Sequence, residues 1–239
     1  MTETNPLAGK SALVTGASKG IGRVVAASLA DAGVRVWCMA RSEAAIKELA
    51  AEIGGEAVVA DITDDVAVWD AVDGITGTLG GPPDIVVNSA GVFGIALSWK
   101  ETVQQFDQRL AVNLRGTFLV NRAVLPGMLE RGSGLIVNLG SVAGRKAYKG
   151  NASYSASKFG LRGYHEVLLE ELRGTGVRGS LVEPASTDTP IWDHLDPDEN
   201  PRLPNREDML RPEDVAEAVL FVATRPDTVS IPVLQIESA

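Results

Sequence analysis

The chain has 239 residues, a length that suits one large domain or two small ones. Hydrophobic residues make up 45% of it and charged residues 22%, which is typical of a globular protein with a full core. The formal net charge of −9 argues against a nucleic-acid partner, because such a surface needs clustered Lys and Arg side chains to neutralise phosphates.

Short apolar runs alternate along the chain with longer segments of helical periodicity. In chain order we expect strand 11–16, helix 21–32, strand 34–40, helix 42–53, strand 57–60, helix 64–80, strand 84–91, helix 101–130, strand 134–141, helix 153–173, strand 177–184, helix 211–223 and strand 231–236. Strands that are apolar on both faces and are followed by helices predict a parallel sheet covered on both sides, in a doubly wound α/β fold. Pro232 suits an edge strand, and Pro212 suits a first helical turn.

The sequence TGASKGIG, residues 15–22, follows the first expected strand and opens the first expected helix. Its spacing, G-x-x-x-G-x-G, is neither a Walker loop nor G-x-G-x-x-G, but the physical basis is shared. Glycines allow a tight turn and a close approach to a pyrophosphate, and the following helix N-terminus supplies N–H groups and a favourable dipole. At this place in an α/β chain the turn predicts a dinucleotide site.

The end of the second expected strand indicates which dinucleotide. NAD sites usually place an acid there for the ribose 2′-OH, whereas this chain has Ala40, followed by Arg41. Lys19 in the glycine turn adds a second cation, and two cations without a carboxylate suit a 2′-phosphate. We therefore predict NADP(H) rather than NAD(H); the nearby Glu43 is the observation that argues the other way.

Five features now occur in one order: TGASKGIG, NSAG at 88–91, Asn113 in LAVNLRGTF, Ser141 in NLGSVAG, and Tyr154 with Lys158 in YSASK. Together they resemble the short-chain dehydrogenase/reductase family over nearly the whole chain. The resemblance implies a seven-stranded, mostly parallel Rossmann sheet flanked by helices, with residues 1–239 forming a single NAD(P)-binding domain. It also implies a homodimer or homotetramer formed through the helices at 101–130 and 153–173.

The resemblance also implies the role of each site residue. Tyr154 would be the general acid/base, Lys158 its partner and a ribose ligand, Ser141 the group that orients the substrate carbonyl, and Asn113 the holder of the central helix and of a relay water. Asp61 would meet the adenine, and Pro184 and Thr189 would border the nicotinamide. The implied cofactor-binding residues are Gly16, Ser18, Lys19, Gly20, Ile21, Gly22, Arg41, Asp61, Ile62, Asn88, Ala90, Gly91, Tyr154, Lys158, Pro184, Thr187 and Thr189.

Physical chemistry supports the central pair independently. A tyrosine has a pKa of roughly 10, too high for a base at neutral pH, and a neighbouring cation lowers it. Lys158 follows Tyr154 by four residues, so a helix places both side chains on one face. Ser141 ends the fifth expected strand, and its hydroxyl and that of Tyr154 are expected to converge on one carbonyl oxygen.

The segment 185–210 carries several prolines and many charges, and we interpret about 186–210 as a lid over the substrate. Trp192 could cover an apolar substrate or anchor the loop, and Phe93, Val142 and Tyr148 are expected pocket walls. His165 and His194 are far apart in the sequence, so no metal site is expected, and His165 is assigned to a surface or an interface.

Two departures from the family pattern concern the backbone near the site. Ala185 stands where a glycine is usual, and alanine disfavours positive φ; the C-terminus lacks the common Gly-rich segment, which puts the usual subunit contacts there in doubt. The polar start and the absence of an apolar run of about 20 residues predict a cytoplasmic protein with no membrane partner. Cys38 lies in an apolar run and is expected to be buried and inert.

The sequence therefore predicts an NADP(H)-dependent oxidoreductase that interconverts a small-molecule carbonyl and an alcohol. Candidate substrates include 3-oxoacyl thioesters, cyclic ketones, sugars and secondary alcohols. Two alternatives stay open: an NAD-dependent alcohol dehydrogenase that works oxidatively, and a nucleotide-sensing protein without catalysis. The intact Ser141, Tyr154 and Lys158 speak against the second alternative.

Overall fold

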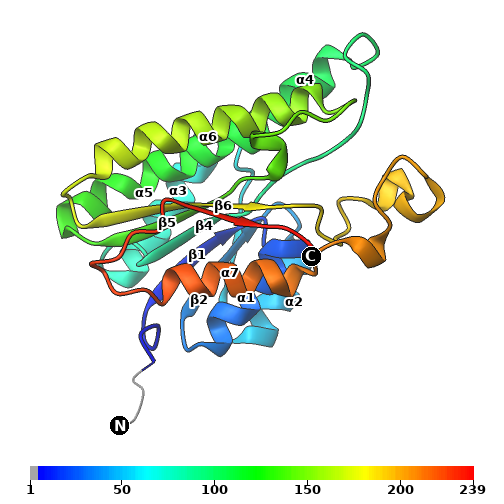
Figure 1. The fold of residues 1–239 in the computed structure, drawn as a ribbon. Coiled ribbons are helices and arrows are strands. Elements are labelled where there is room, and N and C mark those ends of the chain that lie inside the picture. The colour runs from blue at the N-terminus through cyan, green and yellow to red at the C-terminus, as the bar shows by residue number, and fades with distance from the viewer. Residues whose placement is uncertain (1–4) are drawn as a thin grey trace.

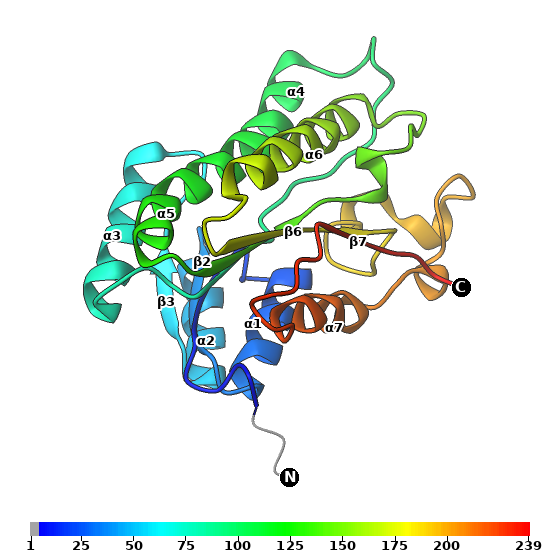
Figure 2. The ribbon, with the colours of Figure 1, turned by 60° about the vertical axis from the view of Figure 1, so that its left-hand side comes forward.

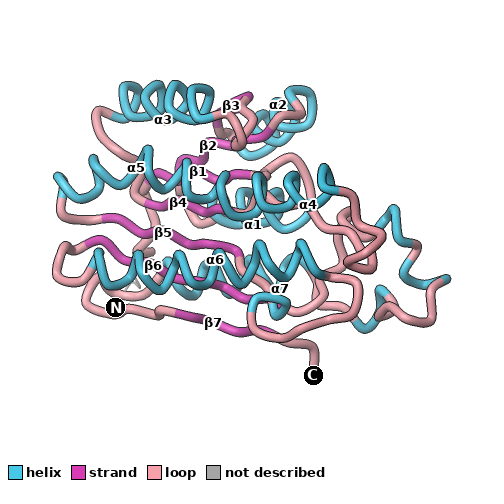
Figure 3. The backbone as a smooth tube through the Cα atoms, turned by 90° about the horizontal axis from the view of Figure 1, so that it is seen from above, coloured by secondary structure: helices cyan, strands magenta, loops and turns pink. Residues whose placement is uncertain are grey.

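The computed structural model describes residues 5–239 and contains one seven-stranded parallel sheet with helices on both faces. The strands are β1 (Ser11–Thr15), β2 (Arg35–Ala40), β3 (Glu56–Val59), β4 (Ile85–Asn88), β5 (Gly134–Leu139), β6 (Val177–Pro184) and β7 (Val233–Ile236). The order across the sheet is β3-β2-β1-β4-β5-β6-β7, which Figure 3 shows from above. This is the doubly wound arrangement predicted from the sequence, and its strand order reverses between β1 and β4.

The helices form two layers. They are α1 (Gly20–Asp31), α2 (Glu43–Ile53), α3 (Asp65–Leu79), α4 (Val103–Leu110), α5 (Thr117–Arg131), α6 (Ala152–Leu172) and α7 (Pro212–Ala223). Figures 1 and 2 show α1, α2 and α7 on one face of the sheet and α3, α5 and α6 on the other. Each layer closes its own hydrophobic cluster against the sheet, because the central strands present Val, Ile and Leu side chains to both sides.

Local sequence explains the ends of these elements. The Asp64 side chain accepts hydrogen bonds from Val66 and Ala67 N–H and begins α3, and Gly80 ends it with a left-handed φ of 71°. Pro212 occupies the first turn of α7, as predicted. Pro232 directly precedes the edge strand β7, where its carbonyl accepts from Leu181 N–H, so its lack of an N–H costs no ladder bond.

The helix expected at 101–130 is observed from Val103 to Arg131, but it is not regular throughout. It is divided into α4 and α5 by a π-helical turn, Ala111–Gly116, which contains Asn113. A π-helical turn inserts one extra residue into the helical register, and such insertions occur mostly at functional sites. Hydrophobic periodicity predicted the helix correctly but could not reveal this local widening.

The segment between β6 and α7 leaves the carboxyl end of the sheet and lies beyond it, as Figure 1 shows in orange. It contains three short 3₁₀ turns and returns to its base through a bridge between Thr187 and Leu210. There Asp188 N–H donates to the Leu210 carbonyl and Leu210 N–H donates to the Ser186 carbonyl. The segment predicted as a lid is therefore a closed loop whose two ends are joined.

Candidate active site

A cavity of about 1110 Å³ lies at the carboxyl ends of the strands, where a doubly wound fold binds its ligands. It extends from the glycine turn before α1 to the segment 185–210. Nearly every residue predicted to contact the dinucleotide lines it. These are Gly16, Ser18, Lys19, Gly20, Ile21, Gly22, Arg41, Asp61, Ile62, Ala90, Gly91, Tyr154, Lys158, Pro184, Thr187 and Thr189.

The glycine turn is packed too closely for side chains. Gly16 has a φ of 68°, and a Cβ atom there would lie 2.6 Å from the Ala90 Cα atom. A Cβ atom on Gly22 would lie 2.5 Å from the Gly16 carbonyl oxygen. The α1 helix that follows has no side-chain cap at Lys19 and no acid in its first turn. Its first N–H groups and its positive dipole end therefore suit a pyrophosphate, so the turn fits the dinucleotide predicted from the sequence.

The adenosine end of the cavity holds two side chains of opposite charge. The exposed guanidinium of Arg41 lies 3.5 Å from the Asp61 carboxylate. Burial opposes ionisation of Asp61, but hydrogen bonds from the Thr63 N–H and hydroxyl, together with Arg41, outweigh it and lower the pKa of this carboxyl. Glu43, the residue that argued against a phosphate site, pairs instead with Lys47 at 2.6 Å. The acid beside Arg41 is therefore Asp61.

Ser141, Tyr154 and Lys158 all line the same cavity. Ser141 follows β5, and its Oγ accepts a hydrogen bond from Ala143 N–H at 3.1 Å, which fixes the hydroxyl. Tyr154 lies in the first turn of α6 and is hydrogen-bonded to Ser141. Lys158 lies one turn further on, and its Nζ donates to the Leu139 carbonyl at 2.7 Å. Strand β5 and helix α6 thus bring together the three side chains predicted as catalytic.

The expected lowering of the Tyr154 pKa is not found in this structure. The ring faces the cavity and is only partly exposed, and burial raises the pKa of its phenol; the Ser141 hydrogen bond opposes this rise only in part. The Lys158 ammonium lies 5.8 Å from the centre of the Tyr154 ring, and burial lowers its own pKa to about 8. The reason is that desolvation disfavours both the phenolate and the ammonium.

Two predicted site residues, Asn88 and Asn113, do not line the cavity. Asn113 lies in the π-helical turn, where its Oδ1 accepts from Val92 N–H at 2.8 Å and its Nδ2 donates to the Val92 carbonyl and to Ser157 Oγ, both at 3.0 Å. It joins the chain after β4 to α6. Asn113 therefore contacts the backbone beside the cavity and the helix that carries Tyr154.

Asn88 was expected to contact the dinucleotide, but its side chain points into the protein interior. Its Nδ2 donates to Asn121 at 2.7 Å and to Asn138 at 2.9 Å. Asn138 in turn donates to Nδ1 of His165, which is fully buried and not at the surface as predicted. Burial lowers the pKa of His165, whose Nε2 donates to the Pro232 carbonyl at 3.1 Å. Asn88 and His165 therefore belong to a polar chain across the sheet, which pattern analysis did not predict.

The substrate end of the cavity has an aromatic wall. The Phe93 ring centre lies 4.8 Å from that of Tyr154, edge to face, and 4.8 Å from that of Trp192. Trp192 is buried, and its Nε1 donates to the Thr187 carbonyl at 3.1 Å. The predicted walls Phe93, Val142 and Tyr148 all line the cavity. Trp192 both lines the cavity and anchors the segment, so its two predicted roles are compatible.

Some lining residues were not predicted individually, although the segment 186–210 was predicted as a lid. Lys149, His194, Arg202, Leu203 and Pro204 line the outer part of the cavity, and four of these lie in the segment 185–210. For Arg202 the sequence signal is a basic side chain in a strongly acidic segment. Ala185, the unusual residue after Pro184, is not among the described residues with positive φ, and its N–H donates to the Ile236 carbonyl. Alanine is therefore accommodated there.

Two further searches concern metals and membranes. Within residues 5–239, no three His, Cys, Asp or Glu side chains are grouped so that they could hold a metal ion. In the same part of the chain, no helix combines the length and the apolar character that a membrane crossing needs.

The comparisons with known proteins agree with this geometry. The family model described as short chain dehydrogenase matches residues 10–200. The chain is 37% identical to D-threitol dehydrogenase of Mycolicibacterium smegmatis, over 91% of this chain and 87% of that protein. It is 40% identical to 2-dehydro-3-deoxy-L-rhamnonate dehydrogenase (NAD(+)) of a Sphingomonas species, over 79% of this chain and 76% of that protein.

Two solved structures are also similar. One is a metagenomic short-chain oxidoreductase in complex with NADP, with 32% identity and a TM-score of 0.83 over 98% of this chain and 99% of that one. The other is a putative NAD(P)-dependent gluconate 5-dehydrogenase from Beutenbergia cavernae with bound NADP, with 30% identity and a TM-score of 0.88 over 97% of both chains. With its fold, its glycine turn and its Ser141, Tyr154 and Lys158, this chain belongs to the short-chain dehydrogenase family of oxidoreductases.

Proposed function

We propose that the chain is an NADP(H)-dependent oxidoreductase that interconverts a ketone and a secondary alcohol. The observation that carries the proposal is the meeting of Ser141, Tyr154 and Lys158 in one cavity with a glycine turn suited to a dinucleotide. The similar proteins named as dehydrogenases of polyols and sugar acids support the same class of reaction. We further propose that residues 1–239 act as a single domain with residues 186–210 as a lid.

The glycine turn with Gly16 and Gly22, together with Lys158, would hold a dinucleotide, which when bound would supply or accept a hydride at the substrate carbon. In the reductive direction, the Ser141 hydroxyl donates a hydrogen bond to the substrate carbonyl oxygen and holds it beside the Tyr154 hydroxyl. As negative charge develops on that oxygen, Tyr154 releases its proton to it, so that the carbonyl gains one hydride and one proton and becomes an alcohol. In oxidation the direction is reversed, and the Tyr154 phenolate oxygen accepts the proton of the alcohol.

Lys158 acts on this proton transfer through charge. Its ammonium is fixed by the Leu139 carbonyl close to the Tyr154 ring, where it favours the phenolate as it forms. Burial brings the Lys158 pKa to about 8, so the charged ammonium form predominates below about pH 8. Asn113 fixes the chain after β4 against α6 and is proposed as a positioning residue.

The preference for NADP(H) is supported by Lys19 and Arg41 in the cavity wall and by the NADP named in both similar structures. NAD(H) remains a second candidate on a specific observation, since Asp61 already pairs with Arg41 and a similar dehydrogenase is named for NAD(+). A 2′-phosphate would have to compete with Asp61 for the guanidinium. Steady-state kinetics with both coenzymes decide between the two.

The test of the reaction is Tyr154→Phe. This change removes the proton donor and keeps the ring against Phe93, so turnover is expected to fall at least a thousandfold while NADPH binding, measured by fluorescence titration, is kept. Substantial turnover in the variant contradicts the proposed chemistry. If the wild type binds NADPH but turns over nothing in a broad carbonyl and alcohol panel, a nucleotide-sensing role replaces the enzymatic one.

We also propose a cytoplasmic homodimer or homotetramer that associates through α4, α5 and α6. The large apolar side chains Phe106, Phe118 and Phe159 on these helices are exposed in the single chain, and their burial would favour association. Sedimentation velocity tests this state, and charged substitution of Phe118 and Phe159 is expected to dissociate the oligomer.

A further inference from the structure

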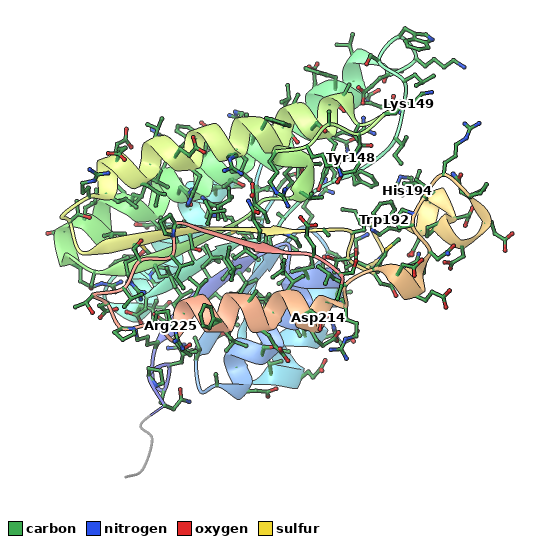
Figure 4. All side chains as sticks on the ribbon, viewed as in Figure 1. Tyr148, Lys149, Trp192, His194, Asp214 and Arg225 are labelled. Atoms are coloured by element: carbon green, nitrogen blue, oxygen red, sulfur yellow. The ribbon has the colours of Figure 1, made fainter. Side chains whose placement is uncertain are left out.

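The substrate end of the cavity carries positive charge on two sides. Lys149 comes from the loop before α6 and Arg202 from the segment 185–210, and both line the cavity, as does His194. Figure 4 shows Tyr148 and Lys149 on one side of the opening and Trp192 and His194 on the other. Asp61, at the adenosine end beside Arg41, is the one acidic side chain in the wall formed by the described residues.

This distribution runs against the charge of the chain, which is −9. Seven acidic residues lie in the segment, and none of them lines the cavity: Asp188, Asp193, Asp196, Asp198, Glu199, Glu207 and Asp208. Arg206 holds three of them: it pairs with Asp188, with Asp193 at 2.7 Å and with Asp198 at 3.9 Å. The segment therefore directs its acids away from the cavity, and one arginine partly neutralises them.

Unlike Arg206, the side chains of Lys149 and Arg202 do not neutralise acidic residues in the described part of the chain. Both are exposed, and neither forms an ion pair anywhere in residues 5–239. Lys146, in the same loop as Lys149, lies over the Tyr148 ring at 5.6 Å and does not line the cavity. The two cations in the wall are thus available to a ligand that reaches from the opening to Ser141 and Tyr154.

We propose that the substrate carries a carboxylate in addition to the reacting carbonyl or alcohol, and that Lys149 and Arg202 bind this carboxylate at the opening. The inference rests on the proposed oxidoreductase function and narrows its substrate class. An arginine and a lysine form charge-assisted hydrogen bonds with a carboxylate, and their field attracts an anion that the rest of the acidic chain repels. A neutral polyol would leave both charges unused.

The names of the similar proteins do not decide this point. 2-Dehydro-3-deoxy-L-rhamnonate and gluconate are acids, whereas D-threitol is a neutral polyol. The charges in the cavity wall of this chain favour the acids. A thioester-linked substrate would bring its anionic groups on the carrier, and the experiment separates it from a simple carboxylic acid.

The experiment uses pairs of compounds that share a carbon skeleton and differ only in the carboxylate: D-gluconate with D-sorbitol, and L-threonate with L-threitol. Oxidation of each compound is followed with NADP⁺ and NAD⁺, beside a set of neutral secondary alcohols and a set of 3-hydroxyacyl thioesters. The variants are Lys149→Gln, Arg202→Gln and their combination. Lys146→Gln is the matched control, because it removes the same charge from the same loop outside the cavity wall.

We expect kcat/KM to be at least about tenfold higher for the acid in one pair or more, and to fall as ionic strength rises from about 0.05 to about 0.5 M. The acid-to-neutral ratio is expected to fall about tenfold in the double variant, mainly through KM, and to stay unchanged in Lys146→Gln.

Three results overturn the inference while the oxidoreductase function stands. They are equal turnover of acid and neutral partners, a ratio that the double variant does not change, and turnover confined to the neutral alcohols or the thioesters. Absence of turnover with every compound and both coenzymes is a different result, since it overturns the proposed function itself.

Discussion

Lys158 offers a direct test of the electrostatics of the site, because its burial works against stability. Burial lowers its pKa from the ordinary 10.5 to about 8, a depression that corresponds to about 3 kcal/mol. Lys158→Met keeps a side chain of similar length and removes the charge. The lost hydrogen bond to the Leu139 carbonyl costs about 1 kcal/mol, so the variant is expected to be about 2 kcal/mol more stable than the wild type near neutral pH.

The gain in stability of Lys158→Met over the wild type is expected to depend on pH in a defined direction. The unfolded chain keeps the Lys158 proton up to about pH 10.5, whereas the folded chain releases it near pH 8. Between these values the unfolded state binds more protons, so the stability of the wild type rises with pH. The advantage of Lys158→Met is therefore complete below about pH 8 and disappears as the pH approaches 10.5.

The assay is urea unfolding followed by circular dichroism at several pH values, at one fixed protein concentration because an oligomer makes stability concentration-dependent. A gain of about 2 kcal/mol corresponds to a rise in Tm of roughly 4–8 °C for a chain of this size. Lys100→Met, at an exposed position, is the control and is expected to change little. The reasoning is refuted if Lys158→Met is no more stable than the wild type near neutral pH, or if the difference does not narrow above pH 8.

Three further predictions concern the two ends of the cavity. Arg41→Asp is expected to lower the preference for NADPH over NADH in kcat/KM about a hundredfold, because a carboxylate replaces the proposed phosphate ligand; an improved preference contradicts the NADP(H) proposal. Ser141→Ala is expected to lower kcat about a hundredfold. It also removes the hydrogen bond that opposes the raised pKa of Tyr154, so the pH profile of alcohol oxidation should move to higher pH, and an unmoved profile would count against this role. Gly16→Ala places a Cβ atom 2.6 Å from the Ala90 Cα atom, so this variant is expected to weaken dinucleotide binding and to lower Tm. Gly163→Ala adds a Cβ atom in open space on α6 and is expected to raise the stability by about 0.5–1 kcal/mol. Equal effects of the two variants in thermal melts would contradict the close packing at Gly16.

The order of strands and helices could be predicted because it depends on patterns that the sequence displays directly. Runs such as SALVT and GLIVNL are apolar on both faces, and only a strand covered on both sides buries them fully. The glycine turn could also be predicted from the sequence, because its glycine spacing is displayed directly. The structure explains these glycines, since Gly16 and Gly22 leave no room for a Cβ atom. The π-helical turn was not visible, because it changes hydrogen bonding by one residue without changing composition.

Polar residues in the interior were the main source of error. Asn88 and His165 were assigned from their place in motifs and helices, but both belong to a buried hydrogen-bonded chain that requires partners from distant strands. The direction of the Tyr154 pKa was wrong for a related reason. The sequence shows the neighbouring cation, whereas only the structure shows how strongly burial disfavours charge. Lys149 and Arg202 could be linked to a substrate carboxylate only after the structure showed that the acidic residues of the lid do not line the cavity.

The π-helical turn at Ala111–Gly116 has a consequence for how this chain tolerates insertions and deletions. Removing one residue from the turn would let α4 and α5 merge into a regular helix. The hydrophobic pattern of the two helices would remain almost the same. The flanking residues would keep their directions, because the π-helical turn is what accommodates the extra residue, but the residues within the turn would be spaced differently around the helix axis. Asn113 would then lose Val92 and Ser157 together, and the backbone beside the cavity would separate from the helix that carries Tyr154. A one-residue gap that costs little in a sequence alignment would thus divide the site in two.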